Sequence, residues 1–228
     1  MKSLKAVLVS AAVCASGAAF AAGGTISGSI AFTGTPPEAQ PLKRNSDPVC
    51  AKKQFNDETV LVTGGKLQNV VVRLKDAPAG QAPVEPVVID QVDCMYRPRV
   101  QAAVVGQKVM VKNSDGTLHN VHTYAGTKTL FNKAQPPKAE PINQAVKEDT
   151  EVMKLKCDVH PWMTGYVVYS KNPYFAVSKA DGSFEIKNVP PGKYTLEAWH
   201  EKLGTQTAEV TVQDGKTAQT NLSFAAAK

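Results

Sequence analysis

The sequence predicts an all-β protein, and three observations lead to this fold class. Its 15 Pro and 16 Gly residues divide the chain into short runs. Those runs are rich in Val, Thr and Tyr, which favour β-strands. Apolar and polar residues alternate along several of them, and no long stretch has the 3.6-residue period of an amphipathic helix. The 228 residues suit one large β domain or two small ones.

The chain begins with a segment that has the three parts of a secretory signal peptide. A basic start with Lys2 and Lys5 precedes an apolar run over residues 6–13, and residues 19–21 (Ala-Phe-Ala) have the small-x-small pattern of a cleavage site. We expect residues 1–21 to be removed on export to the periplasm. The loss of two lysines lowers the formal net charge from +6 to +4.

The rest of the chain excludes two classes of function. No later stretch is long and apolar enough to span a bilayer, so we expect an exported, soluble protein without a membrane span. The positive charges are scattered along the chain rather than clustered, so nucleic acid is not an expected partner.

The first part of the mature chain predicts two strands and two connections. Residues 24–34 alternate as a strand, residues 36–47 are a polar loop that contains Pro, and residues 67–74 are a second strand. A connector rich in Pro, Ala and Gly follows over residues 77–86. We expect the next domain to begin near Val87.

Cys157, His160 and Met163 lie in a short loop between two predicted strands, residues 151–156 and 165–169. Their spacing is Cys-x2-His-x2-Met. A thiolate and an imidazole bind copper strongly, and a thioether adds a weak axial contact. Metal binding would itself form the thiolate, because it releases the thiol proton.

A further nitrogen ligand is expected upstream of this loop. Residues 109–122 predict a strand, an Asn-Ser-Asp-Gly turn, and a second strand that opens with His119 and Asn120. One distant His together with a Cys-His-Met loop forms a His2Cys site with an axial Met. That is the ligand set of blue copper electron-transfer centres.

These two units resemble those of the cupredoxin family, in which they occur in the same order. Pro161 after the His and Trp162 before the Met make the loop most similar to that of amicyanins. The resemblance implies a cupredoxin-like Greek-key β-sandwich over residues 87–171 and one copper ion. The ligands that it implies are His119, Cys157, His160 and Met163. It also implies that one edge of the His160 ring is partly exposed in an apolar patch, which serves as docking surface and electron exit.

His119 and His122 compete for the upstream position. Three residues apart on a regular strand, they point to opposite faces, so both reach one site only if the chain bends. The resemblance favours His119, with Asn120 bracing the ligand loop. We interpret His122 as a surface or hydrogen-bonded histidine; the alternatives are an extra copper ligand or a second metal contact. His200 is expected to be unrelated to the site.

The segments around the two ligand units are also interpreted as strand or loop. Residues 123–149 are rich in Pro and Lys and are expected to form a long surface loop. Residues 172–228 predict a meander of short strands whose turns resemble those of carboxypeptidase regulatory-like domains, small β-sandwiches without catalysis of their own. Such domains often begin with Gly-x-Ile-x-Gly, as residues 24–28 do. We therefore expect the segment 22–86 to pack with the C-terminal module.

Cys50 and Cys94 are expected to form a disulfide, because the compartment is oxidising and both lie outside the ligand loop. A thiolate-rich zinc site that includes Cys157 would require both to stay reduced. A dinuclear copper centre would need a second Cys in the ligand loop, where none is present.

The sequence thus predicts a periplasmic mononuclear copper protein that carries single electrons between redox partner proteins and is not an enzyme. No Cys-x-x-Cys-His haem motif is present, so donor and acceptor must be other proteins. One alternative is copper storage or delivery, which His122 and the methionines at 95, 110 and 153 support, although these methionines are dispersed rather than clustered. The other is a copper-dependent enzyme, which would need a vacant coordination position where Met163 is expected.

Overall fold

The computed structural model describes residues 23–81, 83–145 and 150–226, and its regular structure is almost entirely β-strand. The all-β class predicted from the sequence is confirmed. Within these ranges the exception is one short 3-10 helix, η1 (Cys50–Lys52). The expected signal peptide, residues 1–21, lies outside the described residues. Nowhere in the described ranges is there a helix with the length and apolar character that crossing a membrane requires.

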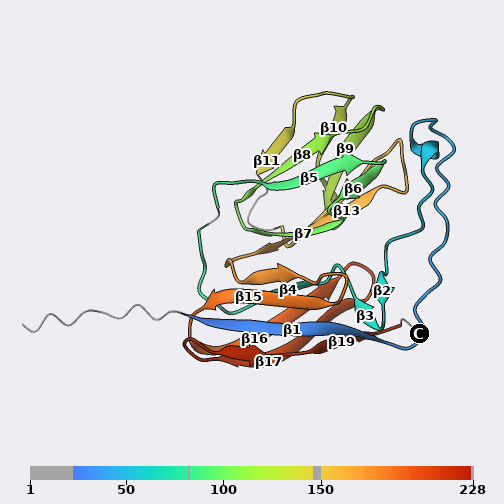
Figure 1. Cartoon of the computed structure of the whole chain (residues 1–228). Helices are drawn as coiled ribbons and strands as arrows, with labels where there is room; N and C mark the ends of the chain where they lie inside the picture. The colour runs from blue at the N-terminus through green and yellow to red at the C-terminus, as the bar shows by residue number, and fades with distance from the viewer. Residues whose placement is uncertain (1–22, 82, 146–149, 227–228) are drawn as a thin grey trace, which may run out of the picture.

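The chain forms two β-sandwiches, one built from both of its ends and one from its middle (Figure 1). We call the first the flanking module. One of its sheets has the order β15-β1-β3-β2, with β18 and β19 also paired to β1, and the other has the order β14-β4-β16-β17. The strands are β1 (Gly24–Thr33), β2 (Val62–Thr63), β3 (Lys66–Leu67), β4 (Val71–Leu74), β14 (Phe175–Val177), β15 (Ser183–Val189), β16 (Gly192–His200), β17 (Gly204–Val212), β18 (Thr217–Gln219) and β19 (Leu222–Ala225).

The second sandwich, the inserted module, occupies the chain between β4 and β14. Its sheets have the orders β10-β9-β12-β13-β7 and β11-β8-β5-β6. The strands are β5 (Val87–Val92), β6 (Met95–Arg97), β7 (Val100–Val104), β8 (Lys108–Asn113), β9 (His119–Ala125), β10 (Lys128–Gln135), β11 (Ile142–Ala145), β12 (Val152–Lys156) and β13 (Thr164–Ser170). Each sandwich has its own buried apolar core.

The alternation of residue types explains how each sheet packs. Strand β16 buries Tyr194, Leu196, Ala198 and His200 at every second position and leaves the residues between them more exposed. Full burial of one Leu side chain stabilises the fold by about 1.5–3 kcal/mol. The first strand contributes in the same way: β1 buries Ile26 and pairs with β15 in antiparallel register, which joins the two ends of the chain in one sheet.

Two expectations from the sequence are wrong in this structure. Residues 123–149 do not form one long loop, because the chain turns at Gly126 and returns as β10, antiparallel to β9; β11 follows and pairs with β8. Both are outer strands of their sheets and mostly exposed, so their sequences lack an alternating apolar pattern. Residues 67–74 are not one strand either. Asn69 has a positive φ of 63°, and the chain there passes from β3 in one sheet to β4 in the other.

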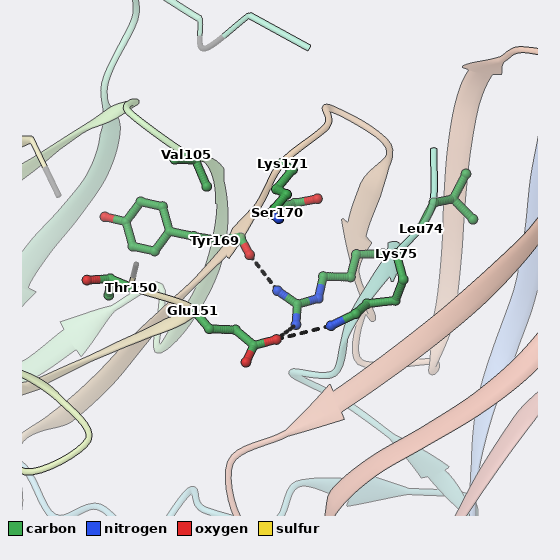
Figure 2. A pocket seen from close by; sticks show the side chains of 9 residues that line it. Leu74, Lys75, Val105, Thr150, Glu151, Tyr169, Ser170 and Lys171 are labelled. Carbon is green, nitrogen blue, oxygen red and sulfur yellow. Dashed lines mark hydrogen bonds and ion pairs between the residues drawn. The ribbon is translucent and has the colours of Figure 1, made fainter. Parts of the chain in front are cut away.

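The two modules share an apolar junction that is reinforced by buried ion pairs. Arg73 is buried, its Nε donates to Glu197 Oε1 at 2.8 Å, and its two NH2 groups donate to the Tyr169 carbonyl and to Glu151. Lys75 also donates to Glu151, and dashed lines mark these bonds to the labelled Tyr169 and Glu151 (Figure 2). Arg73, Lys75, Glu151 and Tyr169 are among the residues that line a junction cavity of about 300 Å³.

One ion pair in which both side chains are buried also crosses the junction. Arg99 of the inserted module forms a bidentate ion pair with Glu201 of the flanking module. Its Nε lies 2.6 Å from Oε1 and its Nη2 lies 2.8 Å from Oε2. Beside it the rings of Tyr166 and Trp199 lie 5.5 Å apart. Removing one member of such a pair leaves an uncompensated buried charge, so the ion pairs specify one relative placement of the modules.

His200 gives the flanking module a defined response to acid. Its ring is buried, and its Nδ1 accepts from the backbone amides of Lys202 and Leu203 at 3.2 and 3.3 Å. Burial, with a smaller contribution from the positive charge of Arg99, lowers the pKa of His200 from 6.5 to about 4. The unfolded chain therefore binds a proton that the folded chain does not between these two values, and folding stability falls as the pH is lowered through this window.

We predict that His200→Asn, which retains an acceptor near the two amides, flattens the dependence of stability on pH between 6.5 and 4. The wild-type protein should lose up to about 3 kcal/mol more than the variant over this window, since one pKa unit corresponds to about 1.4 kcal/mol. Urea unfolding of both metal-free proteins at a series of pH values measures the difference. Parallel stability curves for the two proteins would refute the prediction.

Candidate metal centre

Three of the four predicted ligand residues meet at one end of the inserted module, and Met163 lies in the same loop as two of them. His119 opens β9, Cys157 directly follows β12, and His160 and Met163 lie in the loop that leads to β13. All four side chains are buried. The loop is held at both ends, because β12 and β13 are paired along their length and the Met163 amide donates to the His160 carbonyl at 2.9 Å.

The donor atoms of three of these residues face one another. The Nδ1 atoms of His119 and His160 are 2.9 Å apart, and the Cys157 Sγ lies 4.0 Å from the first and 3.7 Å from the second. All three atoms lie within 4.8 Å of one another, close enough to bind one metal ion. The residues come from segments up to 41 positions apart in the chain. Met163 belongs to the same apolar core as Cys157.

Hydrogen bonds at this centre favour the thiolate form of Cys157. Burial raises the pKa of the thiol, but hydrogen bonds from His119 and from the backbone amides of Asn120, Val159 and His160 outweigh it, and the pKa is lowered from its usual range. For His119, burial lowers the pKa, but hydrogen bonds and charges from Asp115 and Cys157 raise it by a larger amount, so the net shift of the pKa is upward. The pair therefore combines a stabilised anion with a stabilised cation.

His122 is separated from this cluster. Along β9, burial alternates from His119 to His122, so the two rings project from different faces of the strand. The Nδ1 of His122 lies 3.0 Å from an Asp158 carboxylate oxygen, and its Nε2 lies 3.0 Å from the Thr129 hydroxyl. Its ring stacks on Tyr124 at 4.2 Å between centroids. These contacts match a hydrogen-bonded histidine near the surface.

Asn120 connects β9 to the ligand loop. Its backbone amide donates to the Cys157 Sγ at 3.5 Å, and its side-chain Oδ1 accepts from the Asp158 amide at 2.6 Å. Its Nδ2 donates to the Asp158 carboxylate at 2.8 Å. The residue therefore fixes both the sulfur and the chain that follows it.

The ring of His160 is more enclosed than the sequence predicts. The expected partly exposed edge is wrong: His160 is only 3% exposed, and its Nε2 lies 3.1 Å from the Asp47 carboxylate. Asp47 belongs to residues 34–61, which we call the strap. The strap leaves β1, rises beside the inserted module and returns to β2 (Figure 1). An open hollow remains next to it, between Leu118 and Val159, which are 47% and 50% exposed.

A disulfide between Cys50 and Cys94 joins the strap to the inserted module, with 5.6 Å between the Cα atoms. Both residues are therefore unable to act as thiolate ligands. Two nearby aspartates are not among the residues that the sequence predicts for the site. Asp115 stands in the Asn-Ser-Asp-Gly turn, four residues before His119, and this spacing is the one local signal for it. No local pattern marks Asp47, which is 113 residues away from the His160 that it contacts.

Comparisons with known proteins find copper proteins among similar structures. The chain is similar to a purple cupredoxin from Nitrosopumilus maritimus, with 25% identity over 37% of this chain and 99% of that one and a TM-score of 0.33. Amicyanin from Paracoccus versutus matches with 18% identity over 43% of this chain and 97% of that one, at a TM-score of 0.34. A copper-containing nitrite reductase from Thermus scotoductus SA-01 matches with 14% identity over 61% of this chain and 28% of that one, at a TM-score of 0.33.

Sequence comparison adds one family model. Residues 153–220 match the model described as polysaccharide lyase family 4, domain II, which is less than half of the chain. This description differs from the carboxypeptidase regulatory-like resemblance of residues 172–228, which stays a prediction. No curated protein matches the sequence.

Proposed function

We propose that this chain is a periplasmic mononuclear copper protein that carries single electrons between partner proteins. The observation that supports the proposal best is the buried cluster of two imidazole nitrogens and one thiol sulfur, whose atoms all lie within 4.8 Å of one another. His119, Cys157 and His160 would hold the copper ion, and Met163 would supply a further, weaker thioether ligand.

The chemistry of these donors fits copper. Two imidazoles and a thiolate in one plane, with a weak axial thioether, suit both oxidation states of copper, whereas Ca²⁺ and Mg²⁺ prefer oxygen ligands. Bound copper would supply a one-electron couple. The disulfide supports this assignment over a thiolate-rich zinc site, because it leaves Cys157 as the one thiol outside the signal segment.

The role of the protein is to hold the ligands still and to exclude water. The ligand side chains are buried among strands that are paired on both sides, so the donor positions need to change little when the charge of the site changes. Burial of all four ligands also favours electron transfer over catalysis, which requires an open coordination position next to the metal. The hollow between Leu118 and Val159 is the proposed approach to His160 for a redox partner.

The proposed periplasmic location is supported by the signal-peptide pattern and by the disulfide. Residues 1–21 have the pattern of a signal peptide, and disulfides such as Cys50–Cys94 persist in oxidising compartments.

We predict that the mature protein binds one equivalent of Cu(II) and develops an intense thiolate-to-copper absorption band. His122→Ala should leave the stoichiometry, the band and the electron paramagnetic resonance spectrum unchanged, while His119→Ala should alter both spectra, because His122 lies outside the cluster. More than one copper per chain would favour storage or delivery. A weak or absent band in the wild-type protein would contradict the proposed site.

We predict that Asn120→Ala weakens Cu(II) binding by roughly 10- to 100-fold, the usual effect of removing a residue that orients a metal ligand. The loop loses the acceptor for the Asp158 amide, while all four ligands remain. Competition with a chelator of known affinity measures the change. Asn143→Ala is the matched control, because Asn143 lies in β11 and, within the described residues, its side chain bonds only to the nearby Pro141 carbonyl. Equal losses in both variants would argue against the role of Asn120.

A further inference from the structure

The two histidines of the proposed site are held in the same way. Each has its Nδ1 directed toward the other ligands and its Nε2 directed toward a carboxylate. His119 Nε2 lies 3.0 Å from Asp115 Oδ2, and His160 Nε2 lies 3.1 Å from Asp47 Oδ2. Both carboxylates are mostly buried, with side chains 10% and 17% exposed. The two imidazoles thus have matching outer partners, although these partners come from unrelated parts of the chain.

Each carboxylate is in turn held by backbone amides at one half of the disulfide. Asp115 accepts from the amides of Asp93 and Cys94 at 2.7 and 2.8 Å. Asp47 accepts from the amides of Val49 and Cys50 at 2.7 and 3.2 Å. The two half-cystines therefore each donate an amide to one of the two aspartates.

We propose that Asp47 and Asp115 are paired positioning residues for the copper ligands, and that the Cys50–Cys94 disulfide holds this pair in place. The inference rests on the proposed copper site and extends it outward by one layer of residues. In this proposal the aspartates are not metal ligands. They act through His160 and His119.

The physical basis is the hydrogen bond from Nε2 to the carboxylate. A proton fixed on Nε2 leaves Nδ1 as the free donor atom, and the bond also fixes the plane of the ring. A negative charge behind the imidazole makes it a more basic ligand. The more highly charged Cu(II) gains more from this than Cu(I) does. Removing either carboxylate should therefore raise the reduction potential of the site.

Asp47→Asn is a nearly isosteric change that removes one of the two acceptor oxygens of this side chain. One Asp47 oxygen accepts the strap amides, and the other faces His160 and the Thr117 hydroxyl at 2.7 Å. An asparagine has the same shape but only one oxygen. In either orientation of the amide, one of the two sides loses its acceptor.

The test compares Asp47→Asn, Asp115→Asn and the double variant with wild type. In the copper-loaded proteins, each single change should raise the reduction potential, and the double change should raise it more, with a shift in the thiolate-to-copper band. Asp76→Asn is the matched control. Asp76 follows β4 in the flanking module, and its carboxylate accepts from the amide and the hydroxyl of Thr195 at 2.9 and 3.0 Å. It should leave the potential unchanged.

A second measurement uses the metal-free protein, so it does not depend on copper loading. Nuclear magnetic resonance of ¹⁵N-labelled histidine should find a proton on Nε2 of both His119 and His160 in the wild type. Asp47→Asn should change the Nε2 signal of His160 alone, and Asp115→Asn that of His119 alone. The same spectra report whether each variant is folded.

The disulfide is tested with Cys50→Ser and Cys94→Ser combined. Loss of the bridge should disturb both Nε2 signals and raise the potential in the same direction as the Asn variants. If the potential and the Nε2 signals stay unchanged in the Asn variants while wild type shows the intense band, the positioning role is overturned and the copper site stands. If only the Ser variant is unchanged, the role of the disulfide is overturned. If wild type shows no such band, the proposed function fails first and this inference fails with it.

Discussion

The antiparallel pairing of β9 with β12 is the constraint on which the candidate metal centre depends. Its register places His122 opposite Lys156, so the start of β9 lies beside the residue that follows β12. His119 and Cys157 thereby meet although they are 38 positions apart. A slip of one residue would turn His119 to the other face of the sheet, because side chains alternate along a strand. The apolar residues of β9 and β12 in the shared core oppose such a slip, since it would expose them.

The second constraint is the way the chain is nested. The flanking module uses both ends of the described chain, and its first strand continues into the strap that reaches the metal centre. The strap contributes Asp47 and one half of the disulfide, so the surroundings of His160 depend on a segment that starts and ends in the other sandwich. The buried Arg99–Glu201 pair and the bonds from Arg73 to the Tyr169 carbonyl and Glu151 tie the modules together. The inserted module is therefore not an independent unit as far as its ligand end is concerned.

This arrangement distinguishes the centre from one with an open histidine edge. The proposed path to a partner leads past Leu118 and Val159 to a histidine whose outer nitrogen is already bonded. Hydrogen bonds to the two carboxylates restrict the motion of both rings, which in the proposed function would keep rearrangement on electron transfer small. The same enclosure explains why a substrate-binding role is the weaker interpretation of this site.

The sequence by itself determined the elements whose signals are local. Alternating residues predict the all-β class, and the Cys-x2-His-x2-Met spacing identifies three of the residues that gather at the centre. The alternation of side chains along a strand separates His119 from His122, and the family resemblance favours His119 as the ligand. The alternation and the spacing lie within a few residues, where the geometry of one strand or loop decides the outcome.

Only the tertiary structure decided the features that depend on distant contacts. The sequence does not predict the enclosure of His160, because Asp47 reaches it across 113 positions and such a contact leaves no local pattern. Strand β10 has the sequence character of a loop, because an edge strand needs few apolar residues and is defined by its pairing with β9. Strand pairing, the nested modules and the aspartate behind each histidine all arise from packing between segments that lie far apart in the chain.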